Sequence, residues 1–182
     1  MIPLTIIIKI IYLLTGDSNP IFYTQERIGL NGKPFNMYKY RSMVYDSDKQ
    51  LELILQDPKF KKEWEENQKI EDDPRITKFG KFLRKTSIDE VPQFINVFKG
   101  DMSVIGPRPL IPGELEKHNG DKKYNSIKPG ITGWWAVNGR SNNTYENRLK
   151  LEYYYIDNRN ILLDIKIIFM TIFRVLTING VK

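Results

Sequence analysis

The stretch "IFYTQERIGLNGKPFNMYKYRSM", residues 21–43, decides what kind of fold to expect. Apolar and polar residues alternate on both sides of an Asn31-Gly32 pair, which is the strongest short-range signal for a tight hairpin turn. Side chains of a strand point alternately to its two faces, so Lys39 and Arg41 are expected on one face. The sequence therefore predicts a two-stranded hairpin near the start of the chain.

Helical signals dominate the remaining sequence. Residues 46–70 predict two helices that meet at Asp57-Pro58, and residues 72–87 place basic and apolar residues at helical spacing. Asp46-Ser47-Asp48 resembles a metal-binding DxD motif, but at a helix start we favour a helix cap. We therefore expect an α+β fold that is predominantly helical, with a small β-hairpin or sheet and amphipathic helices.

The composition limits the chemistry that the chain can perform. Its 182 residues are about the size of one domain. There is no cysteine, which excludes disulfides, zinc-thiolate sites and thiol nucleophiles, and His118 is the only histidine. The net charge of +6 favours an anionic partner: nucleic acid, an acidic membrane surface or a phosphorylated small molecule.

Both ends of the chain are strongly apolar. "IPLTIIIKIIYLL", residues 2–14, is too short to span a bilayer, and charged residues interrupt "ILLDIKIIFMTIFRVLTI", residues 161–178. Buried core is one interpretation of these segments, and contact with a membrane surface is the other. The basic helix expected within residues 72–87 could equally lie against anionic lipid or form the surface of a soluble protein.

Adjacent carboxylates stand at Asp89 and Glu90 within "TSIDEVPQFINVFKGDMSVIGPRP", residues 86–109. Ser87 and Glu90 have the spacing of a capping box, but Pro92 would then interrupt the helix. We therefore expect the helix to begin at the carboxylates, where proline is tolerated, and to end at Gly100.

This placement has consequences for chemistry. A helix N-terminus favours an ionised carboxylate and attracts phosphate. Adjacent helical residues point roughly 100° apart, so Asp89 and Glu90 should have different roles. A carboxylate can attack phosphorus, and it can also ligate Mg²⁺, which prefers hard oxygen donors. Arg84, Arg108 in Gly-Pro-Arg-Pro and Arg140 after an Asn-Gly turn would supply cations for phosphate.

Four long motifs in order resemble the catalytic domain of the bacterial sugar transferases, which are monotopic polyprenyl-phosphate phosphoglycosyl transferases. Together they cover nearly the whole chain, and a match of this length is very specific. The motifs are "PIFYTQERIGLNGKPFNMYKYRSM", "DDPRITKFGKFLRKTSIDEVPQFINVFKGDMSVIGPRP", "KPGITGWWAVNGR" and "YYIDNRNILLDIKIIFMTI".

The resemblance implies a two-step exchange with a UDP-sugar donor and polyprenyl (undecaprenyl) phosphate as acceptor. Asp89 matches the family nucleophile and Mg²⁺ contact, and Glu90 matches the second member of the catalytic pair. Arg84 and Arg108 match basic positions near the phosphates, Arg140 matches a nucleotide contact, and Lys39 is a weaker match to a phosphate contact. UMP would leave, and a covalent aspartyl-phosphosugar intermediate would form.

The resemblance also implies a location and a division of the chain. Residues 1–15 would be the remnant of a re-entrant membrane helix, whose first arm is missing, and residues 16–182 the catalytic domain. The expected site is the bacterial inner (cytoplasmic) membrane, with membrane lipid as a partner, interfacial amphipathic helices and the catalytic domain facing the cytoplasm. The insertion within residues 55–77 hints at a galactose or glucose donor.

Two other functions stay open at this point. The family commonly has glutamine where this chain has Ala136, and with the missing helix arm this motivates the alternative of a truncated, inactive membrane-bound scaffold. A nucleic-acid-binding module would suit the net charge, but no base-stacking or groove-reading motif is recognisable, so we expect no nucleic acid partner.

Overall fold

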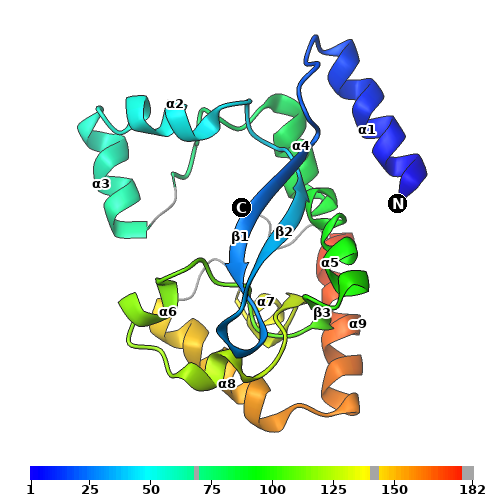
Figure 1. Ribbon diagram of the computed structural model, residues 1–182, viewed down its shortest axis with the longest axis vertical. Coiled ribbons are helices and arrows are strands. Elements are labelled where there is room, and N and C mark those ends of the chain that lie inside the picture. Colours follow the sequence, from blue (N-terminus) through cyan, green and yellow to red (C-terminus); the bar gives the residue numbers. More distant parts are fainter. Residues whose placement is uncertain (68–69, 140–143, 178–182) are drawn as a thin grey trace.

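A two-stranded antiparallel hairpin runs through the middle of the molecule (Figure 1). In the computed structural model, which describes residues 1–67, 70–139 and 144–177, β1 spans Phe22–Ile28 and β2 spans Pro34–Tyr40. Asn31 and Gly32 both have positive φ angles, 56° and 76°. The predicted hairpin is confirmed, although its loop, residues 29–33, is longer than a two-residue turn and contains the 3-10 turn η1, Leu30–Gly32.

The two helices predicted after the hairpin are confirmed as α2, Ser47–Ile54, and α3, Pro58–Asn67. They project to the opposite side of the hairpin from α5 (Figure 1). The predicted cap at Asp46 is only partly right. Asp46 occupies the N-cap position, but its backbone is left-handed, at φ 60°, and its side chain makes no capping hydrogen bond. An N-cap side chain reaches the first turn from an extended backbone, which explains the difference.

Helix α4, Lys78–Lys85, is fixed closely against the chain that follows β2. The Thr77 hydroxyl caps the helix by accepting a hydrogen bond from the backbone N–H of Gly80, at 2.9 Å. Gly80 packs on the backbone of Ser42 so tightly that an added Cβ atom would overlap the Ser42 carbonyl oxygen. Leu83 is fully buried on the same helix. Residues Ser42 and Leu83 thus lock α4 to the hairpin.

The helix predicted to begin at the carboxylates begins later than expected. Asp89 and Glu90 lie in a separate 3-10 turn, η2, Ile88–Glu90, and α5 spans Gln93–Lys99. Ser87 has a left-handed backbone, at φ 56°, and forms no side-chain cap, so the capping box is also absent. The predicted end at Gly100 is confirmed, with φ 84°. The carboxylates therefore sit ahead of the α5 N-terminus instead of within its first turn.

A short parallel pair of strands organises the second half of the chain. Strand β3, Ser103–Ile105, pairs with β4, Gly130–Thr132, and α9 contacts both strands. A hydrogen bond of 2.9 Å joins the hydroxyls of Thr132 and Thr171 and fixes α9. The remaining elements are α6 (Glu114–Lys117), η3 (Lys122–Ser126), α7 (Trp134–Val137), α8 (Tyr145–Asn158) and α9 (Ile161–Thr177).

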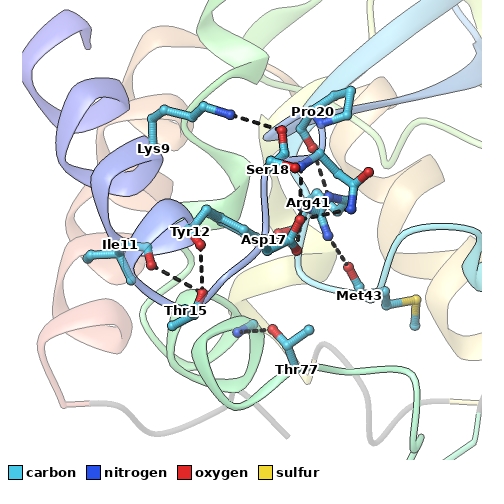
Figure 2. A network of polar contacts seen from close by, with 12 residues as sticks. Lys9, Ile11, Tyr12, Thr15, Asp17, Ser18, Pro20, Arg41, Met43 and Thr77 are labelled. Carbon is cyan, nitrogen blue, oxygen red and sulfur yellow. Dashed lines mark hydrogen bonds and ion pairs between the residues drawn. The ribbon is translucent and has the colours of Figure 1, made fainter.

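Helix α1, Ile2–Leu14, is tied to the end of the hairpin by Arg41. Figure 2 shows the Arg41 guanidinium bonded to Asp17, to the carbonyl of Pro20 and to the carbonyl of Met43, at 2.8, 2.8 and 3.1 Å. The Tyr12 hydroxyl donates to the Arg41 carbonyl oxygen. Arg41 is therefore a buried structural residue, and it anchors α1 on the chain that leads to Ser42.

Most apolar side chains of α1 and α9 face outward, so the buried-core interpretation of the two ends is wrong. Ile8 and Tyr12 are the buried residues of α1, and Ile167 is the buried residue of the described part of α9. Both helices lie on the same side of the hairpin as α5 (Figure 1). Their exposed large apolar residues include Ile2, Ile6, Ile10, Leu14, Ile165, Phe169, Ile172 and Phe173. Among the described residues, no helix is both long enough and apolar enough to span a bilayer.

Candidate active site

The Asp89 carboxylate lies in a short turn held between α4 and β2. Contacts join η2 to both of these elements, and Asp89 is only 7% exposed. The left-handed residue Ser87 ends the α4 connection and starts the turn. A buried carboxylate needs cations or hydrogen-bond donors around it, because desolvation of an unpaired charge is costly. The residues around Asp89 therefore determine what it can do.

Arg84 supplies a positive charge near Asp89. Its Nε atom donates to the Ser42 hydroxyl at 2.8 Å, so the Gly80 contact that fixes α4 also fixes this guanidinium. Burial lowers the pKa of Arg84, and the carboxylates of Asp89 and then Asp73 oppose that shift. Arg84 is thus fixed by Ser42 and lies close enough to Asp89 and Asp73 to interact with the charge of both.

Asp73 and Arg75 form a buried ion pair beside Arg84. The guanidinium of Arg75 bonds both carboxylate oxygens of Asp73, with the shortest distance 2.6 Å from Nη2 to Oδ2. Burial alone would raise the pKa of Asp73, but hydrogen bonds from Arg75 lower it below its usual value. A bidentate pair of this kind is rigid and directional. This ion pair holds two charged groups in fixed positions near Arg84.

Glu90 has a different environment from Asp89. Its Oε1 atom lies 3.4 Å from Nζ of Lys39 on β2, and both side chains are about one-quarter exposed. Lys39, Arg84, Asp89 and Glu90 are thus brought together from β2, α4 and η2. We call these four residues, with Asp73 and Arg75, the aspartate cluster.

Arg108, predicted as a phosphate contact, belongs to a second group of charged residues. Its Nη1 atom donates to Oε1 of Glu114 at 2.7 Å, and Nη2 of Arg148 approaches the same oxygen at 3.3 Å. The other Glu114 oxygen accepts from the backbone N–H of Ile111 at 3.1 Å. Burial would raise the pKa of Glu114, but the charge of Arg108 and these contacts lower it.

Arg27 from β1 adds a third guanidinium to this group. It donates to the Pro109 carbonyl at 3.0 Å and to the Gln25 side chain at 2.6 Å. Burial, and then repulsion from Arg108, lowers the pKa of Arg27 to about 10. We call Arg27, Arg108, Arg148 and Glu114 the arginine cluster.

The hairpin connects the two clusters. Tyr23 pairs directly with Lys39, so their side chains share a face, and Arg27 shares that face with Tyr23 because side chains alternate. Burial and Asp48 raise the pKa of Tyr23, while the positive charges of Arg27 and Arg75 oppose the rise. Tyr23 therefore lies on the face of the hairpin that carries both Arg27 of the arginine cluster and Lys39 of the aspartate cluster.

The buried side chain of Glu152 binds the backbone of Arg108. Oε1 of Glu152 on α8 accepts from the Arg108 N–H at 3.0 Å and lies 3.1 Å from the Tyr124 hydroxyl. That hydroxyl also donates to the Arg108 carbonyl at 2.9 Å. Glu152 is fully buried, and burial raises its pKa to about 8 despite these hydrogen bonds. Glu152 is therefore mainly protonated at neutral pH.

The sequence profile of the bacterial sugar transferases matches residues 1–178. The chain belongs to the bacterial sugar transferase family. It is 46% identical over 93% of its length to an undecaprenyl-phosphate galactose phosphotransferase of Salmonella typhimurium, covering 36% of that relative. It is 44% identical over 96% of its length to a UDP-galactose-lipid carrier transferase of Erwinia amylovora, covering 37% of it. This family member thus spans just over one-third of those two relatives.

A shorter relative and one named for glucose extend the comparison. An uncharacterized sugar transferase, EpsL, of Bacillus subtilis is 38% identical over 96% of the chain, which covers 78% of that protein. A UDP-glucose:undecaprenyl-phosphate glucose-1-phosphate transferase of Escherichia coli is 39% identical over 87% of the chain and 33% of its own length. Relatives named for both hexoses therefore lie at similar identities.

The donor atoms of this family member suit the Mg²⁺ that the resemblance implies. Mg²⁺ is usually held by one or two carboxylates together with substrate phosphate oxygens and water. Asp89 offers a hard oxygen donor, and no group of three or more metal-binding side chains occurs among the described residues. Asp89 would therefore hold the ion together with the phosphates of a substrate.

The other sequence predictions are distributed as follows. Arg140 lies outside the described residues, and Ala136 lies in α7. His118 stacks on Tyr145, with ring centroids 3.5 Å apart, on the outside of the arginine cluster. His118 thus packs against an aromatic ring and does not belong to the aspartate cluster.

Sequence reasoning missed the residues that surround the predicted ones. Ser42 holds Arg84, and Asp73 and Arg75 complete the aspartate cluster. The Asp-Asp-Pro-Arg stretch at residues 72–75 signals the local turn that pairs Asp73 with Arg75. Glu114 follows Arg108 by six residues, and the two form an ion pair only because the chain between them turns back, which their spacing in the sequence does not reveal. For Arg27 a signal was available in the sequence. Arg27 is four residues from Tyr23 on β1, and Tyr23 pairs with Lys39, so alternation along the strands places Arg27 on the same face as Lys39.

Proposed function

We propose that the chain is a phosphoglycosyl transferase, which transfers a sugar 1-phosphate from a UDP-sugar to undecaprenyl phosphate and releases UMP. The observation that carries the proposal is the buried Asp89 carboxylate beside the fixed guanidinium of Arg84. The names of the relatives support a galactose or glucose donor and an undecaprenyl-phosphate acceptor. This reaction would begin the membrane assembly of an exopolysaccharide, O-antigen or capsule.

In the proposed first step, an Asp89 carboxylate oxygen attacks the phosphorus that carries the sugar. A new P–O bond forms to Asp89, the bond from that phosphorus to the bridging oxygen breaks, and UMP leaves with that oxygen. Arg84 is placed to offset charge that gathers on the transferred phosphoryl group. Mg²⁺, when bound with the diphosphate, supplies further charge neutralisation.

In the proposed second step, a phosphate oxygen of undecaprenyl phosphate attacks the same phosphorus. The bond to Asp89 breaks, the carboxylate is regenerated, and the product is an undecaprenyl-diphosphate sugar. Glu90 holds Lys39 at 3.4 Å, which keeps a second cation beside the reacting phosphates. Each step forms one P–O bond and breaks another, so neither step needs an oxidant or a reductant.

The lipid acceptor requires the site to lie at a membrane surface. Exposed aromatic residues bracket the carboxylate turn, with Phe82 on α4 at 52% exposed and Phe98 on α5 at 91%. Helices α1 and α9, which carry many exposed apolar residues, lie on the same side of the hairpin as α5 (Figure 1). We propose that these surfaces enter the headgroup region of the bacterial inner membrane from the cytoplasmic side, which brings Asp89 to the level of the lipid phosphate.

Turnover with purified components tests the chemistry. The chain in lipid nanodiscs, with Mg²⁺ and undecaprenyl phosphate, is offered a panel of UDP-sugars while UMP and lipid-linked sugar are measured. We expect turnover with UDP-galactose or UDP-glucose, and a loss of more than about a thousandfold in Asp89→Asn. Asp72→Asn, at an exposed aspartate, is the matched control. Full activity in Asp89→Asn would remove the nucleophile assignment.

Vesicle flotation tests the membrane surface. We expect the chain to bind vesicles that contain phosphatidylglycerol, and the double variant Phe98→Ser, Phe169→Ser to bind at least about tenfold more weakly, because two exposed aromatic side chains no longer enter the lipid. Leu53→Ser is the control, since Leu53 is 65% exposed but lies on α2, across the hairpin. Equal losses in both proteins would contradict the proposed orientation.

A further inference from the structure

The arginine cluster has more positive than negative charge. Within the described residues it places three guanidinium groups around Glu114, and Glu114 bonds two of them through a single oxygen. Glu152 lies nearby, but its burial raises its pKa to about 8, so it adds little negative charge at neutral pH. Burial, and after it repulsion from Arg108, lowers the pKa of Arg27. The cluster is thus short of anionic charge.

The cluster is also short of hydrogen-bond acceptors. Nε of Arg27 is buried and has no hydrogen-bond acceptor among the described residues. Arg148 lies over the ring of Tyr145, with its central carbon 4.2 Å from the ring centroid, which holds that guanidinium in place. The side chains of Arg108 and Arg148 remain 28% and 20% exposed, so a dissolved anion can reach them. Rigid, reachable guanidinium groups are suited to phosphate.

Glu114 lies between the two reachable guanidinium groups and is itself only 12% exposed. Its Oε1 atom occupies the position between Arg108 and Arg148 that a phosphate oxygen would take. Its distance to Nη2 of Arg148 is 3.3 Å, compared with 2.7 Å to Nη1 of Arg108, so Glu114 binds Arg148 more weakly than Arg108. Helix α6, which carries Glu114, has only four residues, so few backbone hydrogen bonds hold it. A small displacement of α6 would release both arginines.

We propose that Glu114 is a resident competitor, which occupies the arginine cluster until a phosphoryl group of a substrate displaces it. The inference rests on the proposed function for the identity of that substrate, but the competition itself does not require turnover. The phosphoryl group can belong to the donor nucleotide or to the acceptor lipid phosphate. Exchange of one carboxylate for one phosphate would make substrate binding and the release of Arg108 and Arg148 a single event.

Calorimetric titration tests the competition with two probes, UDP and geranyl phosphate. Glu114→Gln keeps an acceptor for Ile111 but removes the competing charge, so we expect at least one probe to bind about tenfold more tightly. Glu116→Gln, at an exposed glutamate of the same helix, removes the same charge and should change binding by less than twofold. Tightening for UDP alone assigns the donor, and tightening for geranyl phosphate alone assigns the acceptor.

Unchanged or weaker binding of both probes in Glu114→Gln would overturn the inference, because it would make Glu114 a support for the arginines. If Glu114→Gln does not fold, Arg148→Gln tests the same cluster. It should weaken the probe that binds there by about fivefold, and unchanged binding would likewise overturn the inference. If Glu114→Gln binds a probe more tightly but the chain turns over no UDP-sugar, the competition stands and the proposed function is rejected. If the chain turns over a UDP-sugar but Glu114→Gln binds neither probe more tightly, the proposed function stands and the competition is rejected.

Discussion

The aspartate cluster and the arginine cluster share one face of the hairpin but differ in their charge balance. Among the described residues, the aspartate cluster sets Asp73, Asp89 and Glu90 against Lys39, Arg75 and Arg84. The arginine cluster sets three guanidinium groups against Glu114. A group with equal numbers of opposite charges offers each carboxylate a cation to interact with, whereas a group with excess positive charge attracts an anion from solution.

The largest effect is expected from removing the balance around Asp89. Arg84→Gln should lower turnover by roughly 100-fold, because it removes a fixed positive charge beside the transferred phosphoryl group. Initial rates of UMP release measure this, and Lys62→Gln on α3 is the control for loss of one positive charge. Turnover reduced equally in the two variants would show that Arg84 acts through net charge alone, and the comparison between clusters would fail.

At the arginine cluster the expected effect is on stability and not on turnover. The pKa of Glu152 is about 8 in the folded chain against 4.5 for an ordinary glutamate, so between these values the folded state holds a proton that the unfolded state has lost. The free energy of unfolding should therefore fall as pH rises from about 5 to about 8. Glu152→Gln should remove this part of the decline, which is on the order of a few kcal/mol.

Urea denaturation at pH 5, 7 and 9 measures this difference. Glu146→Gln is the control on the same helix, and it should keep the wild-type decline, because Glu146 is exposed. Parallel profiles for wild type and Glu152→Gln would contradict the buried, protonated state of Glu152 and would make the arginine cluster less positive than described.

The smallest effect is expected at the edge of the aspartate cluster. Lys39→Gln removes the partner of Glu90 and one cation near the phosphates, but the pair is partly exposed and water screens it. We expect turnover to fall by about fivefold, and by less at high salt. Lys33→Gln, in the hairpin loop, is the control. A loss as large as that of Arg84→Gln would place Lys39 among the residues that contact the reacting phosphate.

Local signals predicted those features of the fold that local physics determines. The Asn31-Gly32 turn, the break at Asp57-Pro58 and the helix end at Gly100 each depend on the backbone preferences of one or two residues. The start of α5 was mispredicted because Ser87 adopts a left-handed backbone that is uncommon outside glycine, and its sequence neighbours do not show this.

The candidate site was predictable where a motif is contiguous and not where distant elements meet. Asp89 and Glu90 are neighbours in sequence, so one motif identified both carboxylates, although they lie in a 3-10 turn instead of the predicted helix. Arg27 and Arg148 come from β1 and α8, and only the packing of those elements around Arg108 brings them to Glu114. Side chains that face each other across a tertiary contact have no fixed spacing in the sequence.

The close packing of Gly80 on Ser42 also has a genetic consequence. Any residue other than glycine at position 80 adds a Cβ atom that overlaps the Ser42 carbonyl, and every missense change of a glycine codon by a single base introduces such a residue. Position 80 contacts no substrate in the proposed reaction. Its close contact with Ser42 nevertheless positions α4 relative to the Ser42 hydroxyl, which accepts a hydrogen bond from Arg84. In a saturation mutagenesis screen for sugar transfer, this codon should tolerate synonymous changes alone.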